Sequence, residues 1–286
     1  MKRNSLKVLG LSGLLTLCLG MAGCYQTRTQ EALIQYTTLK EEAPLVDTPS
    51  SPTLSIAMHY SWLNEKVDSC APRVNSLLQQ ELLGKEFAAL SPTLATDSFK
   101  NTRIRAYRQD IAPIYLKDHP DPSVQSYNFA WYNHTFELAS HLQLGLHDIL
   151  LCQADISEDQ GGAHPDSWSR WFNIDRKTGK LITREEIFPK AQRSQVEQAL
   201  LQALIHQQAG QNPDEEINTL EDLQQIGFLQ NTAIYIPENF LLENEHVSFL
   251  FNRYDIGPYS AGAIVLQLSY EEIGPYMNLN NYETWN

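Results

Sequence analysis

Alternating and helically spaced apolar residues in the first half of the chain predict strands separated by two helices. Apolar residues alternate with polar or small ones over 53–60, which predicts a half-buried strand. Leucines and other apolar residues then recur at helical spacing over 72–90 and 97–116, which predicts two helices. Two further strands are predicted at 126–141 and 148–157.

The second half of the chain predicts a hairpin, a long helix and a group of strands. The hairpin covers 169–183, and Gly179 supplies the positive φ that its turn requires. Thr183 and Glu186 have the spacing of a capping box. The remaining predicted elements are a helix at 191–208, a short surface helix within 211–225, and strands at 232–236, 240–252 and 263–270. This order predicts an α+β fold of two associated subdomains, with mainly antiparallel sheets and helices packed on one face.

The N-terminus has the pattern of a bacterial lipoprotein signal. Three of the first seven residues are basic (Lys2, Arg3 and Lys7), 8–19 is a short apolar run, and small residues precede Cys24. The apolar run is too short to span a ~30 Å hydrocarbon core comfortably as a helix. We therefore expect cleavage before Cys24 and lipidation of its sulfur, which would anchor the protein to a membrane. The alternative is an ordinary secreted protein, cleaved near Ala22, with Cys24 as a plain thiol.

Composition divides the chain into four predicted parts. Residues 1–23 form the signal peptide, and 24–52, rich in Thr, Ser, Pro and Glu, is expected to be a flexible tether. Residues 53–158 and 159–286 are the two expected α+β regions. The lipid anchor and tether place both regions in the cell envelope, on a side of the membrane that faces away from the cytoplasm.

Charge and cysteine content narrow the function classes. The formal net charge is −13, and the basic residues of the leader are lost on cleavage. Such a surface disfavours nucleic acid and favours basic partners, and the alternative is that the acidity only keeps the protein soluble. Of the four cysteines, Cys18 lies in the signal and Cys24 is the lipidation site. Cys70 and Cys152 remain, and in an oxidising compartment they are expected to form a disulfide, with two buried free thiols as the alternative.

Three motifs in the second half resemble an exported domain family. They are Gly161-Gly162-Ala163-His164, then 171–180 with Glu186-Ile187-Phe188, and finally 251–262, which reads FNRYDIGPYSAG. In this order and spacing they resemble DUF3298, over roughly 161–273. The region 54–90 resembles, more loosely, the DUF4163 domain that commonly precedes it. The residues that carry the resemblance, and that could contribute to binding, are Gly161, Gly162, His164, Tyr254, Pro258, Tyr259 and Gly262. The alternative is a structural role, in which the glycines, Pro258 and His164 shape turns and the two tyrosines pack in or near the core with their hydroxyls bonded to the backbone.

The resemblance implies a two-part α+β region in the envelope. Family members include the exported part of RsiV-like anti-sigma factors, which binds lysozyme, and an accessory region of certain peptidoglycan deacetylases. This sequence shows no transmembrane helix with a sigma-binding segment and no deacetylase domain. From the functions of the family, we therefore expect this chain to share binding, and not signalling or deacetylation.

No catalytic or cofactor motif is evident. The sequence contains no HExxH, GxSxG or Walker motif, so neither a helical zinc site nor a nucleophile elbow is expected. His164 and Asp166 could join a metal site only with a remote ligand. The carboxylate pairs Glu185-Glu186 and Glu271-Glu272 are neighbours in sequence and are expected to be solvated surface charge. We therefore expect no catalytic residue, no metal and no cofactor.

Three hypotheses of different classes follow from the sequence. The first is a lipid-anchored, non-catalytic envelope protein that binds lysozyme or a cell-wall component such as peptidoglycan, because an acidic surface favours a basic protein. The second is a structural or accessory lipoprotein of an envelope complex. The third is a polysaccharide-modifying enzyme whose carboxylates converge from distant segments, as glycoside hydrolysis requires.

Overall fold

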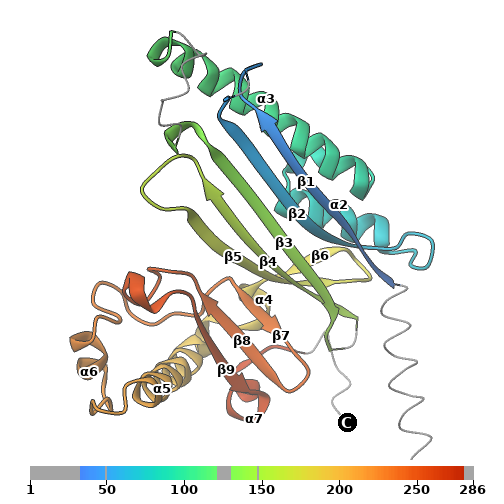
Figure 1. The fold of residues 1–286 in the computed structure, drawn as a ribbon. Helices are drawn as coiled ribbons and strands as arrows, with labels where there is room; N and C mark the ends of the chain where they lie inside the picture. Colours follow the sequence, from blue (N-terminus) through green and yellow to red (C-terminus); the bar gives the residue numbers. More distant parts are fainter. Residues whose placement is uncertain (1–32, 49, 121–129, 147, 280–286) are drawn as a thin grey trace, which may run out of the picture.

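A mixed six-stranded sheet forms the centre of the first lobe (Figure 1). The computed structural model describes residues 33–48, 50–120, 130–146 and 148–279, so Cys24 lies outside the described residues. Neighbouring strands are antiparallel, except that β2 and β3 are parallel. The strands, in sheet order, are β1 (Ile34–Pro44), β2 (Thr53–Leu63), β3 (His134–Leu144), β4 (Ile149–Asp159), β5 (Asp166–Asp175) and β6 (Lys180–Ile182).

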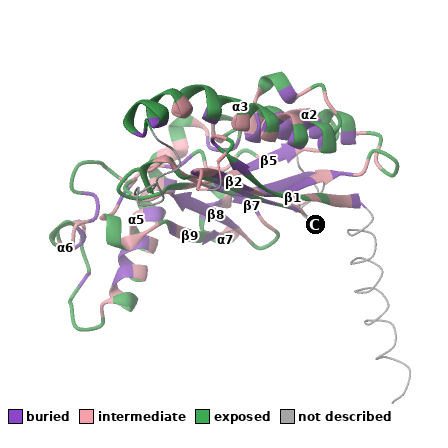
Figure 2. Ribbon diagram, turned by 45° about the horizontal axis from the view of Figure 1, so that its top comes forward, coloured by how far each residue is buried: buried purple, intermediate pink, exposed green. Residues whose placement is uncertain are grey.

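Two helices cover one face of this sheet. They are α2 (Ala71–Leu82) and α3 (Pro92–Asp118), and Figure 2 shows both on the same side of the strands. The alternate residues of β2 that face the helices, such as Ile56 and Tyr60, are buried with the apolar side chains of α2. Because the side chains of a strand alternate between its faces, the intervening residues of β2 point away from this core. Among the described residues no helix has the length and apolarity needed to cross a membrane.

The second lobe packs a three-stranded antiparallel sheet against a long helix. Its strands are β7 (Phe240–Leu242), β8 (His246–Phe251) and β9 (Ile264–Ser269). Its helices are α4 (Arg184–Ile187), α5 (Arg193–Gln211), α6 (Leu220–Gln225) and α7 (Tyr270–Ile273). The core of this lobe also contains Ile149 and Leu151 of β4. The second lobe therefore covers one end of the sheet face that α2 and α3 leave uncovered (Figure 2).

Three asparagine side chains join the two lobes along β5. Each makes hydrogen bonds to backbone groups across the boundary, and two of them bond backbone N–H groups of β5 itself. The contacts are Ser169 N–H to Asn252 Oδ1 (2.8 Å), Asn252 Nδ2 to Ser169 O (3.0 Å), Trp171 N–H to Asn239 Oδ1 (2.9 Å), Asn173 Nδ2 to Phe240 O (2.9 Å) and Leu242 N–H to Asn173 Oδ1 (2.8 Å).

The α+β fold class is confirmed, with one sheet per lobe and α2 and α3 on one face of the larger sheet. The tether interpretation is wrong for 34–44, which forms β1 along the whole length of β2. This strand was missed because its inward residues include the polar Gln35, Thr37 and Glu41, so apolar alternation is weak. Glu41 faces Lys100 of α3 at 3.8 Å, which explains a polar side chain on that side.

The boundary drawn between 158 and 159 falls inside a continuous structure. β4 and β5 are paired on either side of it, so the hairpin of β5 and β6 completes the sheet of the first lobe. The strand predicted at 232–236 is also wrong, because this segment joins neither sheet among the described residues. The carbonyl oxygen of Ile236 instead accepts a hydrogen bond from the Arg184 guanidinium at 2.9 Å.

Cys70 and Cys152 do not form the predicted disulfide and are free thiols. Cys70 is half-buried at the start of α2, beside the Arg73 guanidinium. Cys152 is fully buried in β4, facing the core between the sheet and the helices. Burial raises the pKa of the Cys152 thiol well above its usual range.

Asn173→Ala should lower the free energy of unfolding by about 2–4 kcal/mol. The substitution leaves the buried Phe240 carbonyl and Leu242 N–H without the partners that bridge the lobes, and each orphaned group costs about 1–3 kcal/mol. Urea unfolding measures the change. Asn101→Ala on the exposed surface of α3 is the control, and an equal effect of both substitutions would contradict a special role for Asn173.

Alkylation should label Cys70 in the folded protein and Cys152 only after unfolding. The thiolate is the reactive form, and burial of Cys152 suppresses both its formation and its access to reagent. Peptide mapping by mass spectrometry with and without urea distinguishes the two sites. Recovery of a Cys70–Cys152 linked peptide under non-reducing conditions would contradict the free-thiol state.

Candidate functional site

The face of the six-stranded sheet opposite α2 and α3 is polar, and we call it the open sheet face. Its side chains form cross-strand rows that run from β1 to β5, because the register places them opposite one another. One row is Lys40, Ala57, Glu137, Ser157 and Ser167, and the next is Thr38, His59, Ala139, Asp155 and Ser169.

A groove of about 470 Å³ lies on the open sheet face and is bounded by the second lobe. Ala57 and Ala139 occupy the middle of the two rows, and their small side chains leave space above β2 and β3. This volume is within the range of about 300–1,000 Å³ that is usual for ligand pockets. The polar groups that line it include Thr38, His59, Glu137, Asp155, Ser169 and Arg253.

Hydrogen bonds and ring contacts orient many of these polar groups. The Ser169 hydroxyl donates to Asp155 at 2.5 Å, and the Ser157 and Ser167 hydroxyls lie 2.9 Å apart. At the β1 edge the exposed Tyr36 ring stacks on His59, with centroids 4.9 Å apart. The groove therefore presents hydroxyls, carboxylates and an imidazole on a rigid strand framework, with an exposed aromatic ring at one end.

The loop between β8 and β9 forms the wall of the groove on the side of the second lobe. Asn252 begins a tight turn in which Asp255 accepts a hydrogen bond from the Asn252 N–H at 2.7 Å. Tyr254 has a φ of 73° within this turn, in the left-handed region that is costly for a residue with a Cβ. Its ring is 70 % exposed and lies 5.5 Å from the ring of Tyr259.

Residues from separate sequence motifs meet at this loop. His164, from the turn between β4 and β5, lies 6.1 Å from the Tyr259 ring, and the Arg253 guanidinium lies over that ring at 4.3 Å. We call His164, Tyr254 and Tyr259 the aromatic cluster. The expectation that Tyr254 and Tyr259 pack in or near the core is wrong, because both rings are exposed.

The motif glycines and proline shape the backbone near the aromatic cluster. A Cβ on Gly161, which has a φ of 76°, would lie 2.2 Å from the carbonyl oxygen of Trp131, so only glycine fits there. Gly262 combines a φ of 69° with a ψ of −151°, a region that is essentially restricted to glycine. Pro258 begins the short helical turn that contains Tyr259, whereas a Cβ on Gly162 would make an ordinary contact, 3.8 Å from the His164 carbonyl oxygen.

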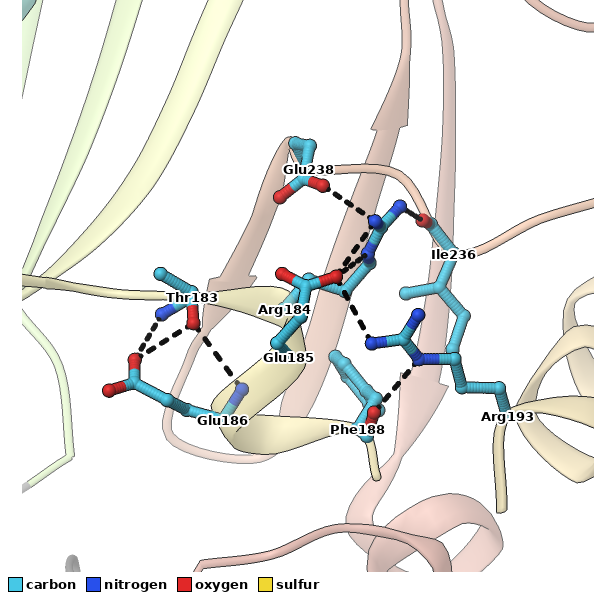
Figure 3. A network of polar contacts seen from close by, with 8 residues as sticks. All are labelled: Thr183, Arg184, Glu185, Glu186, Phe188, Arg193, Ile236 and Glu238. Atoms are coloured by element: carbon cyan, nitrogen blue, oxygen red, sulfur yellow. Dashed lines mark hydrogen bonds and ion pairs between the residues drawn. The ribbon is translucent and has the colours of Figure 1, made fainter. Parts of the chain in front are cut away.

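The carboxylate pairs noted in the sequence have structural roles. Glu186 and Glu272 complete capping boxes with Thr183 and Ser269 at the starts of α4 and α7. Figure 3 shows that Glu185 binds both Arg184 and Arg193, at 2.9 and 3.1 Å. Arg184 beside it holds the pKa of the Glu185 carboxyl below its usual range. This network connects α4, the start of α5 and the segment before β7.

Two further candidates are a cleft on the helix side of the large sheet and the pair His164 and Asp166. A cleft beneath α3 has a volume of about 500 Å³, but its Arg103 is paired with Glu158 and lies over the Phe136 ring at 4.2 Å. Within the described residues no group of three or more His, Cys, Asp or Glu side chains could hold a metal ion. His164 and Asp166 therefore gain no third metal-ligating neighbour from the part of the chain that the structure describes.

Sequence reasoning missed most residues of the groove. Lys40 and Thr38 lay in the segment interpreted as a tether, and Arg253 stood inside a quoted motif without being singled out. One signal was available in β2, where Ser55, Ala57 and His59 separate strongly apolar residues. Small and polar residues at every second position indicate a strand face that is not packed against a core.

Comparisons with known proteins relate part of the second lobe to a protein family and the overall fold to solved structures. Residues 185–271 match the family model described as "Protein of unknown function (DUF3298)". This match confirms the predicted resemblance for α4 through β9, and the motifs at 161–180 lie outside it. No curated protein matches the chain.

Two crystal structures of DUF3298 family proteins share the fold. One, from Bacteroides fragilis, is 22 % identical, with a TM-score of 0.76 over 87 % of this chain and 95 % of that chain. The other, from Pseudomonas aeruginosa, is 14 % identical, with a TM-score of 0.52 over 88 % of this chain and 97 % of that chain. Both lobes are therefore part of a fold that these two bacterial proteins share.

Tyr254→Asn should raise the free energy of unfolding by up to about 1 kcal/mol. Asparagine tolerates the left-handed conformation better than tyrosine, and the exposed Tyr254 ring contributes little burial. Thermal unfolding measures the change, with Ser260→Asn in the same loop as the control. A clear loss of stability for Tyr254→Asn alone would show that the ring packs more tightly than its exposure indicates.

Proposed function

We propose that this chain, whose residues 185–271 belong to the DUF3298 family, is a lipid-anchored, non-catalytic binding protein of the cell envelope. The anchor is the lipid on Cys24, and the folded lobes face away from the cytoplasm. The N-terminal signal pattern supports this location. The resemblance of 54–90 to DUF4163, and of 161–273 to the exported domain of the RsiV-like branch, is part of the same proposal.

The groove on the open sheet face is the proposed ligand-binding surface, and it is the observation that carries the proposal. It combines a suitable volume, small residues along its floor and oriented polar groups along its rows. The aromatic cluster extends one end of it, and exposed tyrosines offer flat apolar surfaces beside polar groups. Ligand sites characteristically combine a concave shape with a few convergent polar groups.

A segment of peptidoglycan is the proposed ligand. Its sugars offer hydroxyls that Thr38, Ser157 and Asp155 could bind, and a linear polymer can enter a groove between two lobes. The groove occupies a volume typical of a small ligand, whereas a standard protein interface buries about 800 Å² on each partner. These features favour a narrow polymer over a globular partner.

Lysozyme is the second candidate ligand, and the charge of the chain supports it. The formal net charge of −13 would accelerate encounter with a basic protein, and such steering weakens as salt screens the charges. Lysozyme would not need to enter the groove, because the charge is a property of the whole surface. The two candidates therefore differ in their expected response to a change in the groove.

Ala139→Trp should abolish or weaken cosedimentation with insoluble peptidoglycan by at least about tenfold. The Ala139 side chain points from β3 into the groove, so an indole there would fill the groove without entering the core. Gln109→Trp on the exposed surface of α3 is the matched control and should sediment like the unmodified chain. The experiment uses the full chain solubilised in detergent.

Lysozyme binding across a salt series separates the alternatives. Saturable lysozyme binding at physiological salt, unaffected by Ala139→Trp and without peptidoglycan binding, would favour the second candidate. Binding of neither ligand by the unmodified chain would refute the proposed function. Release of soluble fragments from peptidoglycan by the protein would instead support the enzyme hypothesis.

A further inference from the structure

Arg253 is a cationic side chain at the groove that lacks a carboxylate partner among the described residues. Its guanidinium lies over the Tyr259 ring at 4.3 Å, and its Nε is buried without a hydrogen-bond partner in the described part of the chain. A buried N–H group that makes no hydrogen bond costs free energy. Arg253 also lines the groove together with its neighbour Asn252.

Several other arginines of this acidic chain form ion pairs with carboxylates, unlike Arg253. Arg170 pairs with Glu81 at 2.7 Å, Arg176 with Asp148 at 2.8 Å, and Arg184 with Glu238 at 2.8 Å. The carboxylates of Asp255 and Asp155 accept hydrogen bonds from groups other than Arg253. Asp255 accepts from the backbone of Asn252, and Asp155 accepts from the Ser169 hydroxyl.

We propose that Arg253 binds a carboxylate group of the ligand. A guanidinium presents parallel N–H donors that match both oxygens of a carboxylate, and stacking on Tyr259 holds its plane in a defined orientation. Because Nε is buried, a ligand carboxylate would meet the guanidinium end-on, through its two Nη atoms. Asn252 is fixed by its reciprocal hydrogen bonds with Ser169, so the backbone at Arg253 is anchored to β5.

The charges in the rest of the groove restrict the ligand further. Lys40 lies on β1, at the opposite end of a row from Ser167 on β5, and four strand spacings separate these strands by roughly 19 Å. Glu137 and Asp155 lie between these edges, so a continuous polyanion would meet like charges in the middle. The groove instead fits a hydroxyl-rich polymer whose carboxylates are spaced apart. This inference rests on the proposed function and deepens it.

Nuclear magnetic resonance of arginine Nε–H groups in the full chain tests the carboxylate site directly. Titration with succinate should shift the Arg253 Nε–H signal saturably, whereas succinamide, which lacks the charge, should not. The signal is assigned by its loss in Arg253→Lys. Exposed Arg105 on α3 is the internal control and should show no saturable shift.

Calorimetry with a soluble disaccharide–peptide fragment of peptidoglycan tests the ligand. Arg253→Gln should weaken binding by about 10- to 100-fold, as expected for loss of a charged hydrogen-bonded pair. Conversion of the fragment's carboxylates to carboxamides should weaken binding to the unmodified chain by a similar factor. The same conversion should have little further effect on fragment binding by the Arg253→Gln variant. Arg253→Lys should keep only part of the affinity of the unmodified chain.

The two measurements fail in different ways. An Arg253 Nε–H signal that does not respond to succinate, or that responds no differently from Arg105, overturns the carboxylate site whether or not the fragment binds. A saturable response to succinate, with no fragment binding to the unmodified chain, would keep the carboxylate site and refute peptidoglycan as its source. Fragment binding that is unaffected by Arg253→Gln would also overturn the inference.

Discussion

The hydrogen bonding of β5 determines how the two lobes are arranged. Backbone groups at a strand edge need partners, and β5 lies where the large sheet meets the second lobe. Asn239 and Asn252 bond N–H groups of β5 with their side chains instead of adding another full strand. Asn173 returns the same kind of bond to β7. The large sheet is thereby joined to the second lobe without merging with its smaller sheet.

This junction explains why the sheet face opposite α2 and α3 is apolar and buried at one end and polar and accessible at the other. On the face of β4 opposite α2 and α3, Ile149 and Leu151 are buried under the second lobe, while Asp155 and Ser157 further along the strand are not. A single strand therefore passes from an apolar contact to a polar groove within a few residues. The groove exists because the second lobe covers only part of a face that helices do not cover at all.

The loop with the FNRYDIGPYSAG motif connects this architecture to the proposed binding role. Asn252 anchors the loop to β5, while the next residue, Arg253, presents a guanidinium stacked on Tyr259. Tyr254 adopts a left-handed conformation, and strained backbone conformations of this kind cluster at functional sites. One segment thus serves as a structural clamp and as the wall of the candidate site.

Regular local patterns were sufficient for much of the fold. Alternation located β2, helical spacing located α2, α3 and α5, and the capping box of Thr183 and Glu186 was confirmed. The DUF3298 resemblance could be recognised because its motifs require particular residues, such as Gly262, whose φ of 69° and ψ of −151° favour glycine. Each of these signals depends on residues close in sequence.

Three features could be recognised only in the tertiary structure. They are the open sheet face, the pairing of β1 with β2, and the free thiols of Cys70 and Cys152. Glu41 of β1 points toward the helices, and its charge is explained only by the ion pair with Lys100 of α3. Whether two cysteines meet depends on the packing of distant elements. The groove likewise brings Lys40, Asp155 and Arg253 together from strands and a loop that are far apart in the chain. Local sequence patterns were enough to predict most of the elements and their buried sides, though not β1, because those patterns depend on neighbouring residues. Contacts between distant segments determined which polar residues share a surface.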